Sequence, residues 1–217
     1  MDLLHKKIIP AIIARNQKEL DERINRVIEY VDIIQLDIMD NKFVPNSSLF
    51  FDFNLPKFEG EFEAHLMVKN PAEWIKKYAG KVDTILVHME SDYKPDEIIE
   101  KVKDLDKKIG FVLNPETSIE KLKPFLDKLD QVLIMTVKPG FYGSPFLPET
   151  LDKIKKLREI KPDLDIEVDG GITDKTITLV DEAGANLFVS GSYIIKAEDI
   201  KKAIEILREK ISKPTLV

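Results

Sequence analysis

The sequence predicts an α/β fold, a single-domain (β/α)8 barrel of the TIM type. Short apolar segments alternate with longer charged segments from one end of the chain to the other. This alternation indicates a parallel sheet, because parallel neighbouring strands need a crossover connection, usually a helix. Eight such units in 217 residues match the size of one closed barrel. No linker, low-complexity tract or shift in composition divides residues 1–217, so we expect one domain.

The predicted strands are short runs rich in Ile, Val and Leu, as is typical of strands covered on both faces. In chain order they are Ile8–Ile13, Ile33–Met39, Phe62–Met67, Thr84–His88, Lys108–Leu113, Gln131–Thr136, Asp165–Asp169 and Leu187–Ser190. An open, doubly wound sheet is the alternative, and it would have a glycine-rich turn after the first strand. Here that strand is followed by Ala14-Arg15-Asn16, without glycine, which favours the barrel.

The predicted helices are charged segments with apolar residues three or four positions apart. In chain order they are Gln17–Tyr30, Pro71–Tyr78, Asp96–Asp104, Ser118–Leu126, Pro148–Ile160, Lys175–Ala183 and Glu198–Lys210. Pro71 and Pro148 lie where proline can begin a helix. Gly184 directly follows a predicted helix, which is the usual place of a capping glycine.

The composition limits the function classes. A net charge of −6 argues against a nucleic-acid-binding surface. The chain has no cysteine, which excludes disulfides and thiolate metal sites and is consistent with a reducing cytoplasm. No apolar run reaches the roughly 18 residues that a membrane span needs, and the first residues have no signal-peptide pattern. We expect a cytoplasmic protein with no nucleic-acid or membrane partner.

The segment 33–39 is an apolar strand that contains one carboxylate, Asp37. With a strand period of two, Gln35, Asp37 and Met39 share one face. A charged group inside a parallel sheet is costly unless it is paired or binds a metal. Asp37 therefore has either a structural partner or a chemical role.

Two further polar residues lie at the carboxyl ends of predicted strands, His65 and Asp169. Active sites of (β/α)8 barrels are at this end. Together with Asp37 and Gln35, these residues form a plausible site for a divalent metal ion. Each has a structural alternative: a single histidine at a strand end is commonly a hydrogen-bonded core residue, and Asp169 before two glycines can form a turn.

Three methionines, Met39, Met67 and Met135, each lie at the end of an apolar strand. Filling the core is the usual role of methionine, and an apolar floor under a reactive centre is the functional alternative. Three loops at the same end of the barrel are rich in small residues. They contain Pro139–Ser144, Gly170-Gly171 and Gly191-Ser192. Small residues let backbone N–H groups approach an anion, so these loops predict a phosphate site.

These motifs together resemble the ribulose-phosphate 3-epimerase family. The matching segments are Leu36–Asn46, His65–Met67, Leu113–Pro115, Met135–Gly143, Glu167–Ile172 and Gly191-Ser192. The resemblance implies a barrel of the ribulose-phosphate-binding type that inverts carbon 3 of a ketose phosphate. The usual substrate pair is ribulose 5-phosphate and xylulose 5-phosphate, and relatives that act on allulose 6-phosphate share the motifs. It also implies a homo-oligomer.

The resemblance assigns roles to individual residues. Asp37 and Asp169 would be the two acid/base groups, and with His65 they would hold one divalent ion (Zn, Mn, Fe or Co) beside an enediolate intermediate. Met39, Met67 and Met135 would pack around that planar intermediate. The residues expected to bind substrate and its phosphate are His65, Gly140, Phe141, Tyr142, Gly143, Gly170, Gly171, Gly191 and Ser192.

Four positions depart from the family pattern. Gln35 stands where the family has a fourth metal ligand, a histidine, and Ala11 stands where it has a serine in the pocket. Lys42 replaces a histidine and Ser144 a glutamine. The amide oxygen of Gln35 can bind a metal, but it is a weaker and harder ligand than imidazole.

Two other functions stay open at this stage. Gln35 and Ala11 also fit a sugar-phosphate-binding protein without turnover. Another phosphate-binding barrel, a lyase or synthase, would need a Schiff-base lysine, for which Lys138 is the candidate.

Overall fold

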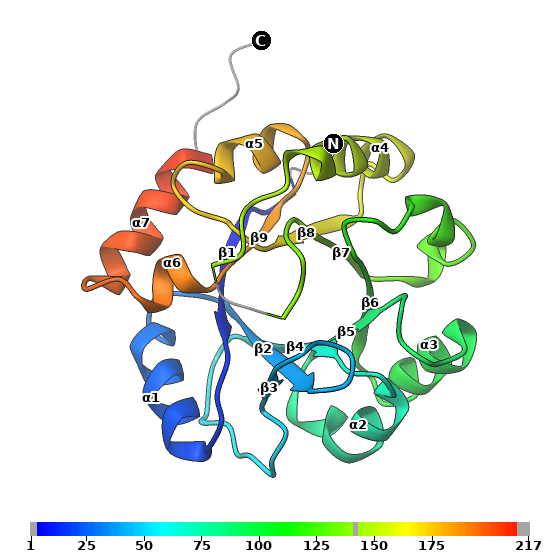
Figure 1. Ribbon diagram of the computed structural model, residues 1–217, viewed down its shortest axis with the longest axis horizontal. Helices are drawn as coiled ribbons and strands as arrows, with labels where there is room; N and C mark the ends of the chain where they lie inside the picture. The colour runs from blue at the N-terminus through cyan, green and yellow to red at the C-terminus, as the bar shows by residue number, and fades with distance from the viewer. Residues whose placement is uncertain (1–3, 141–142, 212–217) are drawn as a thin grey trace.

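A computed structural model describes residues 4–140 and 143–211. It is a closed barrel of parallel strands surrounded by helices, as predicted (Figure 1). The strands are β1 (Lys7–Ile12), β2 (Ile33–Asp40), β3 (Ser47–Ser48), β4 (Glu61–Met67), β5 (Thr84–His88), β6 (Lys108–Leu113), β7 (Gln131–Met135), β8 (Asp165–Asp169) and β9 (Leu187–Ser190). Their order is β1-β9-β8-β7-β6-β5-β4-β2-β3, and pairing of β1 with β2 closes the barrel.

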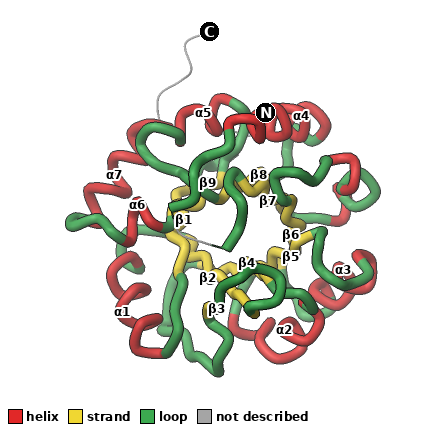
Figure 2. Tube along the Cα trace, viewed as in Figure 1, coloured by secondary structure: helices red, strands yellow, loops and turns green. Residues whose placement is uncertain are grey.

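The helices lie outside the ring of strands (Figure 2). The α-helices are α1 (Gln17–Val27), α2 (Pro71–Tyr78), α3 (Pro95–Lys103), α4 (Leu151–Ile160), α5 (Ile177–Glu182), α6 (Ser192–Ile195) and α7 (Ile200–Ile211). Short 3-10 helices are η1 (Ala79–Lys81), η2 (Ile119–Lys121), η3 (Leu126–Lys128) and η4 (Pro148–Thr150). In the described part of the chain, no helix is long and apolar enough to cross a membrane.

Local sequence explains where the helices begin and end. The side chain of Asn16 accepts a hydrogen bond from the backbone N–H of Glu19 and caps α1. Pro71 occupies the first turn of α2, where its missing N–H is not needed. Gly184 follows α5 with a φ of +108°, a conformation that favours glycine.

The predicted helix over Ser118–Leu126 is wrong. The structure has only η2 and η3 there, separated by residues that do not form a helix. Pro124 explains the difference, because proline in a helix interior lacks the N–H donor and clashes with the preceding turn. The connection between β6 and β7 is therefore made without an α-helix.

The short strand β3 was not predicted. It pairs antiparallel with the end of β2, with Met39 opposite Ser48 and Asp40 opposite Ser47. Asp40 accepts hydrogen bonds from the backbone N–H groups of Lys42 and Phe43 and so stabilises the turn. The hairpin holds the segment after β2 beside the barrel opening.

The apolar core has two parts. The larger part lies between the strands and the outer helices and includes the buried side chains of Phe53, Phe111 and Phe188. The smaller part fills the barrel interior with Ile9, Ala11, Ile33, Leu187 and Val189 on one side and Leu86, Val112, Leu133, Met135 and Val137 on the other. Polar residues from β2, β4 and β8 share this interior, which brings them together.

Candidate active site

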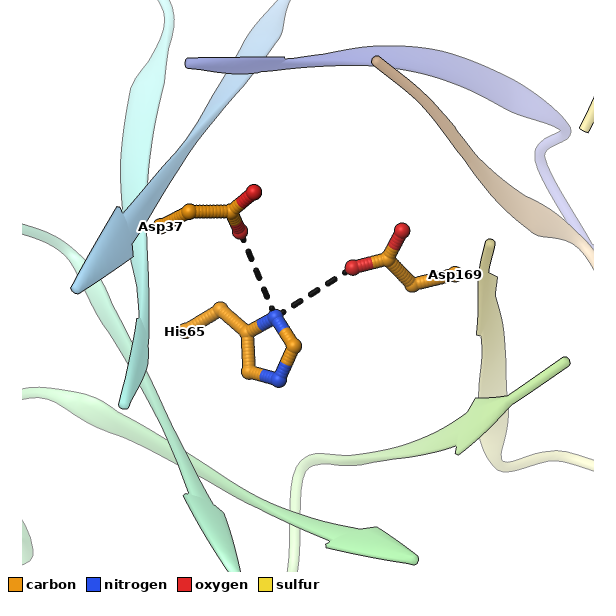
Figure 3. Close-up of side chains that lie close together, drawn as sticks. All are labelled: Asp37, His65 and Asp169. Carbon is orange, nitrogen blue, oxygen red and sulfur yellow. Dashed lines mark ion pairs between the residues drawn. The ribbon is translucent and has the colours of Figure 1, made fainter. Parts of the chain in front are cut away.

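Asp37, His65 and Asp169 meet at the carboxyl end of the barrel (Figure 3). Asp37 and His65 are register partners on β2 and β4. Asp169 comes from β8, which lies three steps from β2 through β1 and β9. His65 Nδ1 is 3.3 Å from Asp37 Oδ1 and 3.2 Å from Asp169 Oδ2. The two carboxylates thus approach one imidazole nitrogen from different sides.

The electrostatics of the site follow from burial and mutual contact. Burial raises the pKa of Asp37, and the contact with His65 only partly offsets this effect. Burial by itself would lower the pKa of His65, but the hydrogen bonds to Asp169 and Asp37 outweigh it and raise that pKa to about 9. In the absence of any cation, an imidazolium therefore supplies the positive charge between the two carboxyl groups.

Gln35 belongs to the same site. Its side chain is fully buried on β2, and Nε2 donates hydrogen bonds to Asp37 Oδ1 at 2.9 Å and Asp169 Oδ2 at 3.0 Å. Nε2 also lies 3.5 Å from His65 Nδ1. The structure therefore brings together all four residues that the sequence indicated as possible metal ligands.

Two residues behind His65 were not assigned a role from the sequence, His88 and Glu90. His65 Nε2 lies 2.9 Å from His88 Nε2, and His88 Nδ1 lies 3.2 Å from Glu90 Oε2. Burial lowers the pKa of His88 to about 4 despite the contact with Glu90, so this imidazole is neutral. With Nδ1–H donating to Glu90, His88 Nε2 accepts the proton of His65 Nε2. His65 Nδ1 is thereby directed at the two carboxyl groups.

Glu90 is itself held in place. One carboxylate oxygen accepts hydrogen bonds from the backbone N–H of Asn114 and from the hydroxyl of Thr117. Burial opposes the charge of Glu90, but its hydrogen bonds with His88 and Thr117 are stronger and lower its pKa. The sequence carries a signal for this chain of contacts, since His88 and Glu90 are two residues apart at the end of a predicted strand.

A pocket lies above the site and contains most of the residues predicted to contact substrate. Asp37 and Asp169, with little exposed surface, are among its lining residues. Its other lining residues are Ala11, Ile13, Met39, Met67, Met135, Val137, Pro139, Gly140, Gly143, Ser144, Gly170, Gly171, Ile172, Val189, Gly191 and Ser192. Met39 and Met67 pack with Val44, and Met135 packs with Leu133 in the barrel interior. The pocket therefore combines two carboxyl groups, apolar walls and loops of small residues.

The predicted phosphate loops are these loops of small residues. Gly140, Gly143, Gly170 and Gly171 all have positive φ angles, which glycine adopts more easily than other residues. Gly191 directly precedes α6, a short helix that begins at Ser192. The side-chain amide of Asn46 donates to the carbonyl of Gly140 and joins the segment after β2 to the loop after β7. The predicted residues Phe141 and Tyr142 lie outside the described residues.

Lys138 does not fit the Schiff-base alternative. It is exposed, and within residues 4–140 and 143–211 no lysine lines the pocket. A Schiff-base mechanism needs the amine in contact with the substrate carbonyl. The site's chemistry instead depends on its carboxyl groups and imidazole.

A second buried polar cluster lies at the other end of the barrel interior and was also not predicted. Gln131 Nε2 is 2.8 Å from Glu167 Oε2 and 3.4 Å from Glu63 Oε2. Burial raises the pKa of Glu63 to about 7. Burial and the neighbouring carboxyl group of Glu63 together raise the pKa of Glu167 well above its usual value. The sequence signal is the strand period, because Glu63 and Glu167 each precede a site residue by two positions.

Comparison with known proteins identifies the family. The sequence pattern of the ribulose-phosphate 3-epimerase family matches residues 7–195. The chain is 35% identical to a ribulose-phosphate 3-epimerase of Schizosaccharomyces pombe over 97% of this chain and 96% of that protein. It is 38% identical to one of Bacillus subtilis over 93% of this chain and 98% of that protein. The chain belongs to the ribulose-phosphate 3-epimerase family. The resemblance inferred from the motifs is thus confirmed, and the protein is an isomerase of the ketose-phosphate 3-epimerase type.

Solved structures of lower sequence identity share the fold. A 3-hexulose-6-phosphate synthase aligns with a TM-score of 0.63 and 21% identity, covering 94% of this chain and 99% of its own. A KGPDC from Streptococcus mutans aligns with a TM-score of 0.70 and 17% identity, covering 96% of this chain and 98% of its own. At these identities the likeness supports only the barrel fold, which agrees with the family assignment.

The described residues fit the divalent metal ion that this epimerase family uses. One ligand atom from each of Asp37, His65 and Asp169 lies within 4.8 Å of the others, as one small cation requires. The contacts of His88 and Glu90 direct the lone pair of His65 Nδ1 to the same point once its proton is lost. Two carboxylates and one neutral imidazole form a donor set that suits several divalent ions.

Proposed function

We propose that the protein interconverts ribulose 5-phosphate and xylulose 5-phosphate by inverting carbon 3. The observation that carries this proposal is the pair of carboxyl groups, Asp37 and Asp169, that converge on one point and line one pocket. Inversion needs one group that removes a proton from one face of carbon 3 and a second that returns a proton to the other face. Asp37 on β2 and Asp169 on β8 approach the site from different sides and can fill these two roles.

The environment of Asp37 suits a proton donor. Burial raises the pKa of Asp37, which favours its protonated form as the acid. Asp169, with 14% of its side chain exposed, lines the pocket from β8. In one direction Asp169 takes the carbon 3 proton while Asp37 delivers one, and the roles reverse for the other epimer. A divalent cation held by Asp37, His65 and Asp169 would supply positive charge beside the two oxygens of the enediolate.

The pocket walls support the same substrate. The side chains of Met39, Met67 and Met135 are apolar and adaptable, and they can cover the planar intermediate and exclude water. The glycine loops at Gly170-Gly171 and Gly191-Ser192 can offer backbone N–H groups to the phosphate. This is where (β/α)8 barrels commonly bind phosphate, after the seventh and eighth barrel strands.

Proton NMR in deuterated water tests the proposal directly. Protein stripped with a chelator and reloaded with Zn²⁺, Mn²⁺, Fe²⁺ or Co²⁺ is given ribulose 5-phosphate or, in parallel, allulose 6-phosphate, and the spectrum is read after the paramagnetic ion is removed. We expect deuterium at carbon 3 together with formation of xylulose 5-phosphate. Faster turnover of allulose 6-phosphate would make the hexulose phosphate the substrate. Absence of exchange with every ion, in protein that still binds the sugar phosphate, would leave a binding protein without turnover.

The setting of the enzyme is part of the proposal. We propose that residues 1–217 form one catalytic domain that acts in the cytoplasm as a homo-oligomer, without nucleic-acid or membrane partners. The net charge of −6 and the lack of cysteine support the absence of a nucleic-acid partner and the cytoplasmic setting, and the family resemblance supports assembly. Light scattering of the purified protein measures its oligomeric state.

A further inference from the structure

Gln35 lies at the centre of the candidate metal site and not at its edge. Gln35 lies on β2, where it is in register with Ala11 on β1 and Glu63 on β4. Its side chain has no exposed surface. The amide nitrogen contacts Asp37 Oδ1, Asp169 Oδ2 and His65 Nδ1. His65 Nδ1 is itself 3.2 Å from Asp169 Oδ2 and 3.3 Å from Asp37 Oδ1. One NH₂ group therefore faces the same three atoms that would bind a cation.

The chemistry of an amide explains this orientation in the absence of a cation. An NH₂ group has two donors, and the site offers two carboxyl acceptors at 2.9 and 3.0 Å. Turning the amide round would bring its oxygen against both carboxyl groups, which is repulsive. The nitrogen is thus the favourable end only while no metal cation lies between Asp37 and Asp169.

The other end of the amide is unsatisfied. Gln35 Oε1 is buried and has no hydrogen-bond partner among the described residues. A buried carbonyl oxygen without a donor costs free energy. A divalent cation reverses the preference of the site, because an amide nitrogen has no lone pair to offer while an amide oxygen is a ligand for hard cations. Rotation of the amide exchanges the two ends with almost no change in shape.

We propose that Gln35 is a reversible placeholder for the cation. Without a cation, Nε2 bridges Asp37 and Asp169 and holds them together. With a cation, the side chain presents Oε1 as a fourth ligand. The inference rests on the metal site of the proposed function but not on turnover.

A glutamine ligand also affects the choice of metal. Two carboxylates, one amide oxygen and one imidazole make a harder donor set than one with a second imidazole. The protein should therefore accept Mn²⁺ well relative to Zn²⁺. Binding of either ion also has to break the two hydrogen bonds of Nε2, so it should be readily reversible.

NMR of the glutamine side chains tests the reversal. The chain has three glutamines, so labelling the side-chain carbonyl with ¹³C and the amide with ¹⁵N produces few signals. On saturation with Zn²⁺, followed in parallel by calorimetry, we expect the Gln35 carbonyl carbon to move downfield and its NH₂ protons to move upfield. Gln131, which donates to Glu167 elsewhere in the barrel, is an internal control that should not shift. An unmoved Gln35 carbonyl in Zn²⁺-saturated protein, or no Zn²⁺ binding at all, would overturn the proposal.

Metal affinity tests the ligand role separately. We expect Gln35→His to shift the ratio of Zn²⁺ to Mn²⁺ affinity at least about tenfold toward Zn²⁺, because imidazole is the softer ligand, and Gln17→Glu on α1 to leave it unchanged. An unchanged ratio in Gln35→His would show that residue 35 is not a ligand.

Thermal melting without metal tests the placeholder role. Gln35→Glu keeps the shape but removes the donors, so its metal-free form should melt at a lower temperature than the wild type and recover when Zn²⁺ is added. Equal melting temperatures of the two metal-free forms would contradict the bridging role. All three measurements use no sugar phosphate, so a failed epimerase assay would leave this inference standing. An unmoved Gln35 carbonyl in Zn²⁺-saturated protein would in turn leave the proposed epimerase activity standing.

Discussion

At the scale of single residues, the site depends on which atom of each side chain faces the centre. His65 presents Nδ1 to Asp37 and Asp169 because its other nitrogen is occupied by His88. The amide of Gln35 presents nitrogen because its neighbours are carboxyl groups. Function at this scale is decided by hydrogen-bond partners more than by residue type.

Replacing either aspartate should block epimerisation, but each variant should keep proton exchange at carbon 3 for a different epimer. In Asp37→Asn, Asp169 can still exchange the carbon 3 proton of one epimer with solvent, but inversion is blocked. We expect kcat for epimerisation to fall about 10² to 10⁴-fold in each variant, with deuterium exchange kept for one epimer in Asp37→Asn and for the other in Asp169→Asn. NMR of both epimers in deuterated water, at saturating metal, measures this pattern. The same residual exchange in both variants would argue against two separate bases.

The partners of His65 should affect metal affinity without contacting the metal. In Glu90→Gln the carboxylate that fixes the proton on His88 Nδ1 is lost, so His65 is less well directed. We expect metal affinity to fall about tenfold or more, as for other residues that orient a ligand histidine. Glu116→Gln changes a carboxylate in the following loop and serves as the control. Calorimetric titration with Mn²⁺ makes the comparison, and equal affinities would exclude a positioning role for Glu90.

At the scale of elements, the loops after the strands shape the pocket, and two glycines show how. Gly170 after β8 has a φ of +115°, and a Cβ atom there would lie 2.3 Å from Val137 Cγ2. Gly143 has a φ of +81°, but a Cβ atom would meet nothing within 4 Å. Both positions favour glycine for conformational reasons, and only Gly170 also needs it for close packing between neighbouring loops.

This difference predicts unequal effects of alanine. Gly143→Ala should cost about 1 kcal/mol of unfolding free energy from backbone strain alone. Gly170→Ala should cost about 3 kcal/mol or more, since the methyl group also displaces Val137. Denaturant unfolding of the two variants measures both values. A loss for Gly170→Ala no larger than that for Gly143→Ala would mean that the loop moves aside easily.

At the scale of the whole molecule, the barrel interior holds two polar layers. The upper layer is the site, and the lower layer is the buried cluster of Glu63, Gln131 and Glu167. Register places Glu63 and Glu167 on the same strands as His65 and Asp169, two residues earlier. Stability and activity therefore share one low-dielectric interior, and the lower layer should make stability depend on pH.

The sign of that dependence follows from Glu63. Its pKa is about 7 in the folded protein against 4.5 without the fold, so folding favours the protonated form. This contribution is fully present below pH 4.5 and is lost as the pH rises through 7. It amounts to at most roughly 3 to 4 kcal/mol, since one pKa unit corresponds to about 1.4 kcal/mol. Glu63→Gln should lose less stability than the wild type between about pH 5 and 8, the range in which this carboxyl group ionises.

Urea unfolding of the metal-free protein at several pH values across that range tests this prediction. Glu61→Gln, a partly exposed position on the same strand, is the control and should follow the wild type. Parallel pH profiles for wild type and Glu63→Gln would contradict the assignment.

Local sequence patterns were sufficient to predict the fold class and the residues that converge at the barrel mouth. Strand–helix alternation and a period of two are properties of short segments, so they place Asp37, His65 and Asp169 on the inner face at strand ends without knowledge of neighbours. The family motifs could also be found from local sequence, because each lies within one short segment.

Contacts between distant side chains became known only from the three-dimensional arrangement. The bridging amide of Gln35, the contact of His65 with His88 and the cluster around Gln131 each join different strands of the barrel. Likewise, the hairpin strand β3 depends on how segments pack, whereas the missing helix before β7 has a local cause in Pro124. Hydrogen bonding and desolvation act between neighbours in space, and strand register determines which residues those neighbours are.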